Sequence, residues 1–393
     1  MSRVTIKGRM SRVTIKEEVL RWAVDRAGLT MESLRRKFPN VQQWASGDSQ
    51  PTLRQLESLA KVTLTPLGFF FLSKPPQERL PMPHFRTLDG GSPRGPSPNL
   101  LATVQMMQKR QSWMREYLVE NGEKPLPFVG AARRDEQPVS VVQSIRQALD
   151  IDESWASRKP TWTEALRTLR EILENAGILV VTNSIVGNNT RRKLDLGEFR
   201  GFILVDEYAP LVFVNGVDGK AAQMFTLAHE LAHVFFGSSA AFDLREMQAA
   251  NDPMEQACNR VAAEFLVPER QLRLSWPSVR QNPEPFQLLA RQFKISALVA
   301  ARRALDLGLI RKNAFLSFYR DYQSDERRKA AQQTEGGDFY ANQNLRVSRR
   351  FAATVIRAAK EGKLLYSDAY QMTGLYGKTF DRYVESFEFG GPS

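Results

Sequence analysis

Cysteine and histidine are scarce in this sequence. Its 393 residues include one cysteine, Cys258, and three histidines, which excludes a disulfide framework and a cysteine-rich zinc module. A single thiol is typical of a reducing compartment. No apolar run approaches the roughly 18 residues that span a bilayer, and no apolar segment typical of a secretory signal stands near the start. We therefore expect a cytoplasmic protein without a membrane partner.

Charge is abundant and biased toward basic residues. The chain has 55 Lys and Arg against 43 Asp and Glu, a net charge of +12. Such an excess is compatible with binding to nucleic acid or to an acidic partner. It is equally compatible with a surface that charge keeps soluble. At about 100–200 residues per domain, the length predicts two to four domains.

The N-terminal part contains a short exact repeat. The sequence MSRVTIK occurs twice within the first 16 residues, and seven residues are too few for a structural repeat unit. We interpret residues 1–9 as a duplicated start or expression scar. Residues 10–72 then read as several short helices, two of them capped by Thr30 and Thr52. This pattern predicts a small helical domain.

The remaining chain predicts an α+β fold that is mostly helical. Three short runs rich in Val, Ile and Phe predict a small three-stranded sheet, with the basic stretch Arg191–Lys193 as a loop between the first two. The predicted strands are Ile178–Thr182, Gly201–Val205 and Leu211–Val214. Two long helices follow them, about Lys220–Phe236 and Pro253–Leu266.

Changes in composition indicate the remaining boundaries. Prolines and glycines mark a linker before the first long helical segment, and a polar break separates the last two helical units. The expected segments are a linker at 73–99, a helical connector at 100–159, the domain with the strands at 160–275, a helical, helix-turn-helix-like extension at 276–323, a polar linker at 324–346 and a C-terminal helical unit at 347–393. We expect the last unit to bind a partner or to form an oligomer.

One motif carries recognisable chemistry. In FTLAHELAHVFFG, residues 225–237, His229, Glu230 and His233 form H-E-x-x-H. On a helix, positions i and i+4 are about 40° apart, so both imidazoles leave from one face and can bind one Zn²⁺. Glu230 can take a proton from water on that zinc. The alternative is a pair of buried core histidines; the third histidine, His84, lies in the linker.

A catalytic zinc also needs a third protein ligand. Because Ser239 occupies the position of the third metzincin histidine, we expect a carboxylate. The candidates are Asp243, Glu246, Asp252, Glu255 and Glu264. Glu255 and Glu264 are nine residues apart on one helix and therefore point to opposite sides. Geometry favours Glu255, beside the polar Asn259; the alternative for Glu255 is a carboxylate that complements the helix dipole.

These segments together resemble the ImmA/IrrE family of zinc metallopeptidases. The resemblance rests on FTLAHELAHVFFG, on EQACNRVAAEFLVP at residues 255–268 and on FRGFILVDEYAPLVFVN at 199–215, and it covers about residues 160–310. It implies a gluzincin-like core with one catalytic Zn²⁺. In that family the matching glutamate is the third ligand, which falls on Glu255 here.

The resemblance also implies a function. Family members typically cut one partner, often a helix-turn-helix repressor, so we expect a zinc metalloendopeptidase that cleaves or controls a repressor or antitoxin-like protein. Leu211–Val214 would be an edge strand that pairs with the substrate. The sequence identifies no oxyanion-stabilising residue; Tyr208 is a guess, and the alternative is that it is a turn residue. The alternative is a non-proteolytic antitoxin or transcriptional regulator of a toxin–antitoxin pair, in which the fold binds a toxin. An intact Glu230 counts against that alternative.

Residues 17–72 resemble the Cro/C1-type (Xre) helix-turn-helix, above all in WASGDSQPTLRQLESLAK from Trp44 onward. This implies operator DNA as a partner and regulation of the protein's own operon. However, the segment between Phe38 and Trp44 is shorter than a turn plus recognition helix. The alternative is a dimerisation or partner-docking module, and hence a homo-oligomer. The candidate DNA contacts are Arg35, Arg36, Lys37, Gln42 and Gln43.

Overall fold

The computed structural model describes residues 12–78, 96–238, 240–242, 252–324 and 339–389. The chain forms two compact units, here called the head and the body. The head comprises Met1–Pro81 and Arg86–Val104, and the body comprises Met82–Phe85 and Gln105–Ser393. The predicted duplicated start and most of both predicted linkers lie outside the described residues.

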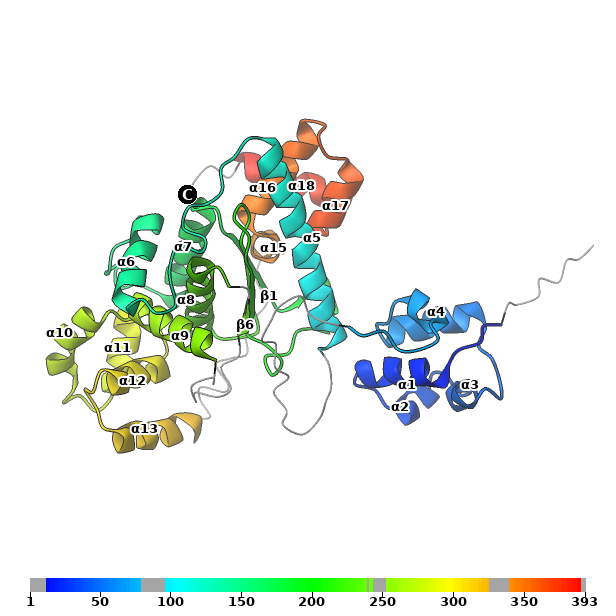
Figure 1. The fold of residues 1–393 in the computed structure, drawn as a ribbon, viewed down its shortest axis with the longest axis horizontal. Coiled ribbons are helices and arrows are strands. Elements are labelled where there is room, and N and C mark those ends of the chain that lie inside the picture. Colours follow the sequence, from blue (N-terminus) through cyan, green and yellow to red (C-terminus); the bar gives the residue numbers. More distant parts are fainter. Residues whose placement is uncertain (1–11, 79–95, 239, 243–251, 325–338, 390–393) are drawn as a thin grey trace, which may run out of the picture. The chain divides into compact units, whose positions relative to one another are not determined.

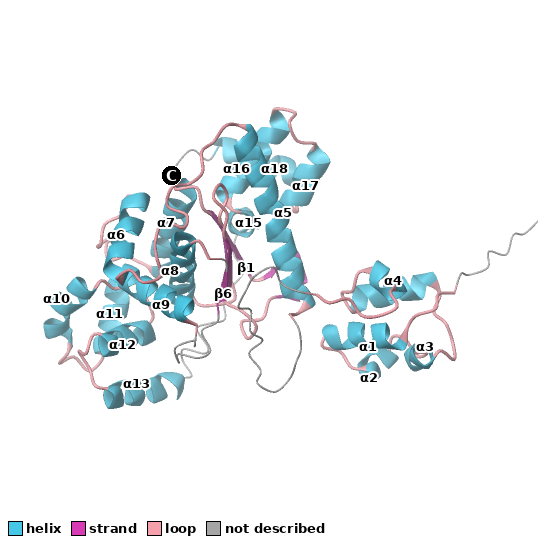
Figure 2. Cartoon of the chain, viewed as in Figure 1, coloured by secondary structure: helices cyan, strands magenta, loops and turns pink. Residues whose placement is uncertain are grey.

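Short helices build the head (Figure 2). They are α1 (Glu17–Arg26), α2 (Met31–Arg35), α3 (Val41–Ser46), α4 (Leu53–Val62) and the 3₁₀ helix η1 (Leu67–Phe71). Thr30 and Thr52 cap α2 and α4 with reciprocal hydrogen bonds to Ser33 and Gln55, as the sequence predicts. Gly47 ends α3 at a φ of +85°, which suits glycine.

Helices also dominate the body (Figure 1). The long helix α5 (Pro98–Glu120) begins in the head and ends in the body. The others are α6 (Pro138–Leu149), α7 (Trp162–Asn175), α8 (Lys220–Phe236), α9 (Pro253–Leu266), α10 (Glu269–Val279), α11 (Pro285–Phe293), α12 (Ala297–Asp306), α13 (Lys312–Ser324), α15 (Phe339–Val347), α16 (Arg349–Lys360), α17 (Tyr366–Thr373) and α18 (Lys378–Phe389). Among the described residues, none of the helices combines the length and the apolar character that crossing a bilayer requires.

A small mixed sheet lies at the centre of the body. Its strands are β1 (Leu179–Asn183), β4 (Gly201–Leu204), β5 (Leu211–Asn215) and β6 (Ala240–Phe242), in the order β1-β5-β4-β6. β1 and β5 are parallel, and the other neighbours are antiparallel. The three predicted strands are thus confirmed with bounds shifted by one residue at most, and β6 adds a fourth.

Two expectations about the strands are wrong. β5 lies between β1 and β4, so both of its edges are already paired and it cannot bind a substrate by strand addition. The basic stretch Arg191–Lys193 is not a loop, because it belongs to β3 (Asn189–Lys193), which forms an antiparallel hairpin with β2 (Ile185–Val186). Both errors concern pairing between strands, which a local pattern does not specify.

Helix α8 is held from several sides. It packs against β4 and β5 of the sheet, and against α7 and α9. At its C-terminal end, the backbone N–H groups of Gly130 and Ala132 donate to the carbonyls of Val234 and Phe235, at 3.0 and 2.9 Å. The bond to Phe235 satisfies a carbonyl in the last turn of the helix, where intrahelical partners are missing. The position of α8 is therefore fixed by the sheet, the neighbouring helices and the segment before α6.

The C-terminal helices pack onto the same body. Helices α11 and α12 meet at Lys294, which has a φ of 56°. Helix α15 lies against β1, the hydroxyl of Ser348 donates to Glu174 on α7 at 2.6 Å, and the amide of Asn188 donates to the carbonyl of Gly374 at 3.0 Å. The last unit is thus attached through polar contacts as well as packing.

Candidate metal centre

Helix α8 carries the histidine motif into the core. The side chains of His229, Glu230 and His233 have no solvent exposure, because this stretch of α8 is surrounded by the sheet and by α9. The Nε2 atoms of His229 and His233 lie 3.1 Å apart. The spacing of four residues thus brings two ring nitrogens together, as the sequence predicts.

Glu255 completes a group of three donors. It lies in the first turn of α9, which Pro253 begins and Asp252 caps by accepting a hydrogen bond from Met254 N–H at 2.7 Å. The Glu255 carboxylate oxygens lie 3.1 Å from Nε2 of His229 and 3.3 Å from Nε2 of His233.

Asn259 orients the first histidine. Its Oδ1 lies 3.0 Å from Nδ1 of His229, so the ring proton belongs on Nδ1 and the lone pair on Nε2. Burial lowers the pKa of His229 and keeps the imidazole neutral, which is the metal-binding form. The sequence placed Asn259 on this face of the helix, but it gave no signal for its role toward His229.

These donors fit a zinc ion. Tetrahedral ligands at about 2.0–2.1 Å from zinc lie about 3.3 Å from one another, and the separations here are 3.1, 3.1 and 3.3 Å. Lone pairs on Nε2 of His229 and on the carboxylate of Glu255 converge on one point, and such an arrangement is stable when a cation lies between them. His229, His233 and Glu255 are therefore the residues that would hold the metal.

Glu230 lies beside this group in a water-poor environment. Both of its carboxylate oxygens are buried and have no hydrogen-bond partner among the described residues. Burial, followed by the negative charge of Glu255, raises the pKa of Glu230 well above its usual value. Gly201 on β4 makes room for this side chain: a Cβ at that position would lie 3.3 Å from Oε1 of Glu230 and 2.5 Å from Cγ2 of Thr226.

The two other predicted carboxylates that the structure describes have partners of their own. Glu264 points away and pairs with Arg303 in a buried ion pair, while Asp252 serves as the cap of α9. Asp243, Glu246 and His84 lie outside the described residues. Tyr208 lies in the turn after β4, where its backbone N–H donates to the carboxylate of Asp206. The guanidinium carbon of Arg115 lies 5.0 Å from the centre of the Tyr208 ring. Its position gives no support to an oxyanion role.

Cys258 is a site neighbour that the sequence analysis missed. Its sulfur and one ring nitrogen of each histidine lie within 4.8 Å of one another. Burial, then the carboxylates of Glu255, Glu230 and Asp252, raise the pKa of this thiol well above its usual value. The available signal was its position three residues after Glu255, which puts both side chains on one side of α9.

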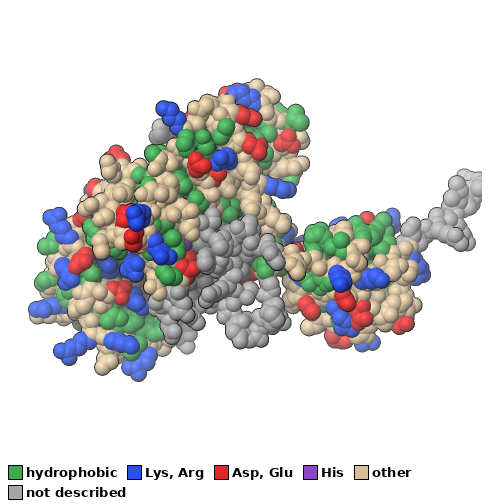
Figure 3. All heavy atoms as spheres, in the orientation of Figure 1, with side chains coloured by type: hydrophobic (Ala, Val, Ile, Leu, Met, Phe, Trp, Pro, Cys, Tyr) green, Lys and Arg blue, Asp and Glu red, His purple; other side chains and the backbone are tan. Residues whose placement is uncertain are grey.

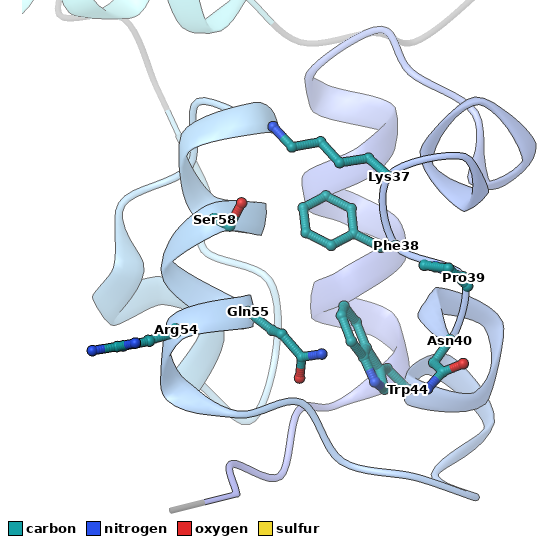
Figure 4. A pocket seen from close by; sticks show the side chains of 8 residues that line it. All are labelled: Lys37, Phe38, Pro39, Asn40, Trp44, Arg54, Gln55 and Ser58. Carbon is teal, nitrogen blue, oxygen red and sulfur yellow. The ribbon is translucent and has the colours of Figure 1, made fainter. Parts of the chain in front are cut away.

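The predicted DNA contacts are exposed on the head. Arg35, Arg36, Lys37, Gln42 and Gln43 are all on the surface, and α3 has only six residues. A groove of about 330 Å³ lies between the α2–α3 turn and α4 (Figure 4). Its lining includes the basic Lys37 and Arg54 and the aromatic Phe38 and Trp44. Basic and acidic side chains are interspersed on the visible face of this unit (Figure 3). DNA binding by these residues stays a prediction.

Comparison with known families supports the resemblance of the body to a metallopeptidase family. No curated protein matches the chain. Residues 347–386 match a domain of unknown function, which corresponds to α16, α17 and most of α18. Residues 173–305, from the end of α7 to α12, match the model of the IrrE N-terminal-like domain, a peptidase family. The candidate metal centre therefore lies within a peptidase-like domain of the kind that the sequence resembles.

Proposed function

We propose that the protein is a zinc-dependent endopeptidase that cleaves or controls a partner repressor or antitoxin-like protein. The observation that carries the proposal is the convergence of His229, His233 and Glu255 at 3.1–3.3 Å. Beside them is the carboxylate of Glu230, for which the described residues provide no hydrogen-bond partner. The match of residues 173–305 to a peptidase family supports it. Zinc held by these residues would supply a Lewis acid that lowers the pKa of water to about 7.

The protein's own residues divide the work of peptide hydrolysis. His229, held by Asn259, presents Nε2, while His233 and Glu255 complete the donor set. Glu230 is not one of these donors and serves as the general base that accepts a proton from water and passes it to the leaving amine. Its burial excludes competing solvent, and a positive metal beside it favours the ionised form that a base requires.

The head and the setting extend this proposal. The head would position the peptidase at operator DNA or on its partner, in a cytoplasmic stress or toxin–antitoxin response, with the whole chain as a monomer or a homo-oligomer. Its exposed basic residues and the resemblance of residues 17–72 to a helix-turn-helix support this role.

Glu230→Gln tests the peptidase. The zinc-loaded chain is mixed with the purified product of the adjacent gene, and cleavage is followed by mass spectrometry. The variant should retain one zinc per chain but lose at least about 100-fold in cleavage rate, because it lacks the base. Glu207→Gln, which changes an exposed carboxylate in the loop after β4, should cleave like the unmodified protein. Equal cleavage by Glu230→Gln would contradict the proposed mechanism.

A second candidate function is a non-proteolytic regulator that binds a toxin through this fold. The complete burial of His229, Glu230 and His233 favours it, because a peptide bond must reach these groups before it can be cut. In the same experiment, stable co-purification with the partner and no cleavage by the zinc-loaded protein would support this second function.

A further inference from the structure

Cys258 is a buried nucleophile that the proposed mechanism leaves unused. It is the only cysteine of the chain, has no solvent exposure and lies one helical turn after Glu255 on α9. Its sulfur and one ring nitrogen from each of His229 and His233 lie within 4.8 Å of one another. Two helices therefore bring four potential metal donors to one place.

A second observation concerns the hydrogen bonds of the two histidines in this cluster. Nδ1 of His233 is buried and has no hydrogen-bond partner among the described residues, whereas Nδ1 of His229 is held by Asn259. The His233 ring thus lacks, among the described residues, the hydrogen bond on the second ring nitrogen that usually orients a metal-ligating histidine. A ring without that restraint can adjust its tilt when a fourth donor joins the site.

We propose that the metal binds in a closed form with four protein ligands, in which the sulfur of Cys258 occupies the position that a catalytic site leaves open. Four protein ligands are typical of structural zinc, whereas catalytic zinc keeps three and an open position. The closed form is therefore latent, and the site can act on a substrate only after the sulfur leaves. The inference rests on the metal centre of the proposed function and not on its peptidase activity.

The chemistry requires no electron transfer. One metal–sulfur bond forms and the thiol proton is released to solvent, because a coordinating thiol is deprotonated by its metal. Thiolate is a soft ligand that suits zinc. The buried position disfavours a free thiolate, so metal binding and loss of this proton are coupled. A sulfur and a ring nitrogen that share one tetrahedral zinc lie about 3.6 Å apart, and the sulfur and the two nitrogens lie within 4.8 Å of one another here.

X-ray absorption at the zinc edge of the full-length, zinc-loaded protein tests the inference. We expect a sulfur neighbour at about 2.3 Å, along with nitrogen and oxygen neighbours at about 2.0–2.1 Å. Cys258→Ala should retain zinc but lose the sulfur neighbour, and Cys258→Ser provides a closer match in size. Val261→Ala, a buried position on the same helix, removes apolar packing without removing sulfur and should keep the sulfur neighbour.

A simple hydroxamate, which needs an open position on zinc, provides a second measurement. It should bind the zinc-loaded Cys258→Ala variant at least about tenfold more tightly than the unmodified protein, because the unmodified protein must first release its sulfur. Bound zinc with only nitrogen and oxygen neighbours, or equal hydroxamate affinity, would overturn the inference and leave the proposed function intact. Failure of the unmodified protein to bind zinc would overturn both.

Discussion

At the scale of single residues, the neighbours of the metal centre decide what each donor can do. His229 and His233 lie on the same helix, but within the described part of the chain only His229 has a hydrogen-bond partner on Nδ1. Glu255 and Glu264 share α9, yet one contacts the histidines and the other pairs with Arg303. Identical residue types thus acquire different roles through the side chains that face them.

Asn259→Ala should weaken zinc binding by about 10–100-fold, because His229 loses the partner that fixes its tautomer and ring orientation. Competition with a chromophoric chelator measures the affinity. Arg260→Ala, an exposed neighbour on the same helix, should leave the affinity unchanged. An unaltered zinc affinity in Asn259→Ala would show that His229 does not depend on this contact.

At the scale of elements, the close approach of β4 to α8 builds one wall of the centre. It depends on Gly201, where a Cβ would lie 2.5 Å from Cγ2 of Thr226 and 2.9 Å from the carbonyl oxygen of Phe213. The strand and the helix therefore approach only because glycine has no side chain. Glu230 lies at the same contact, so the packing of the two elements also positions the proposed base.

Gly201→Ala should lower the free energy of unfolding of the body by about 1–3 kcal/mol, because the added methyl overpacks this contact. Urea titration measures the loss. Adding Thr226→Ser to Gly201→Ala removes the Cγ2 methyl group that the new Cβ would meet, and it should recover part of the lost free energy of unfolding. Gly219→Ala, where a Cβ would have open space, should cost about 0.5–1 kcal/mol because alanine is a poorer N-cap of α8 than glycine, and Thr226→Ser should recover none of that cost. Equal recovery by Thr226→Ser in both glycine variants would contradict the packing argument.

At the scale of the whole molecule, the C-terminal helices are tied to the peptidase-like domain through Glu174. This half-buried residue on α7 accepts a hydrogen bond from the Ser348 hydroxyl, and its backbone carbonyl accepts one from Arg350. Burial raises the pKa of Glu174 above its ordinary value of 4.5, and the bond from Ser348 offsets part of this. The attachment therefore contains an ionisable group that folding prefers to keep protonated.

This raised pKa predicts a pH dependence of stability. Protonated Glu174 contributes to the free energy of unfolding, because the folded state binds the proton more tightly than the unfolded state. This contribution is fully present below about pH 4.5 and is lost as the pH rises through the raised pKa of the folded state. Glu174→Gln stays neutral and should lack this loss, so its stability relative to the unmodified protein should increase with pH. Urea titrations across this range measure it, with the exposed Glu171→Gln as control. Parallel pH curves for Glu174→Gln and the unmodified protein would contradict the prediction.

The sequence by itself determined the features that depend on neighbours along the chain. Helix geometry alone explains why His229 and His233 share one face of α8 and why Glu255 and Glu264 lie on opposite faces of α9. The three main strands follow from short apolar runs. Only the tertiary structure decided the interior place of β5, the added strand β6, the contact of Asn259 with His229, and the approach of Cys258 and Gly201 to the centre. These depend on how distant segments pair and pack, and local patterns of hydrophobicity carry no information about which distant side chains will meet.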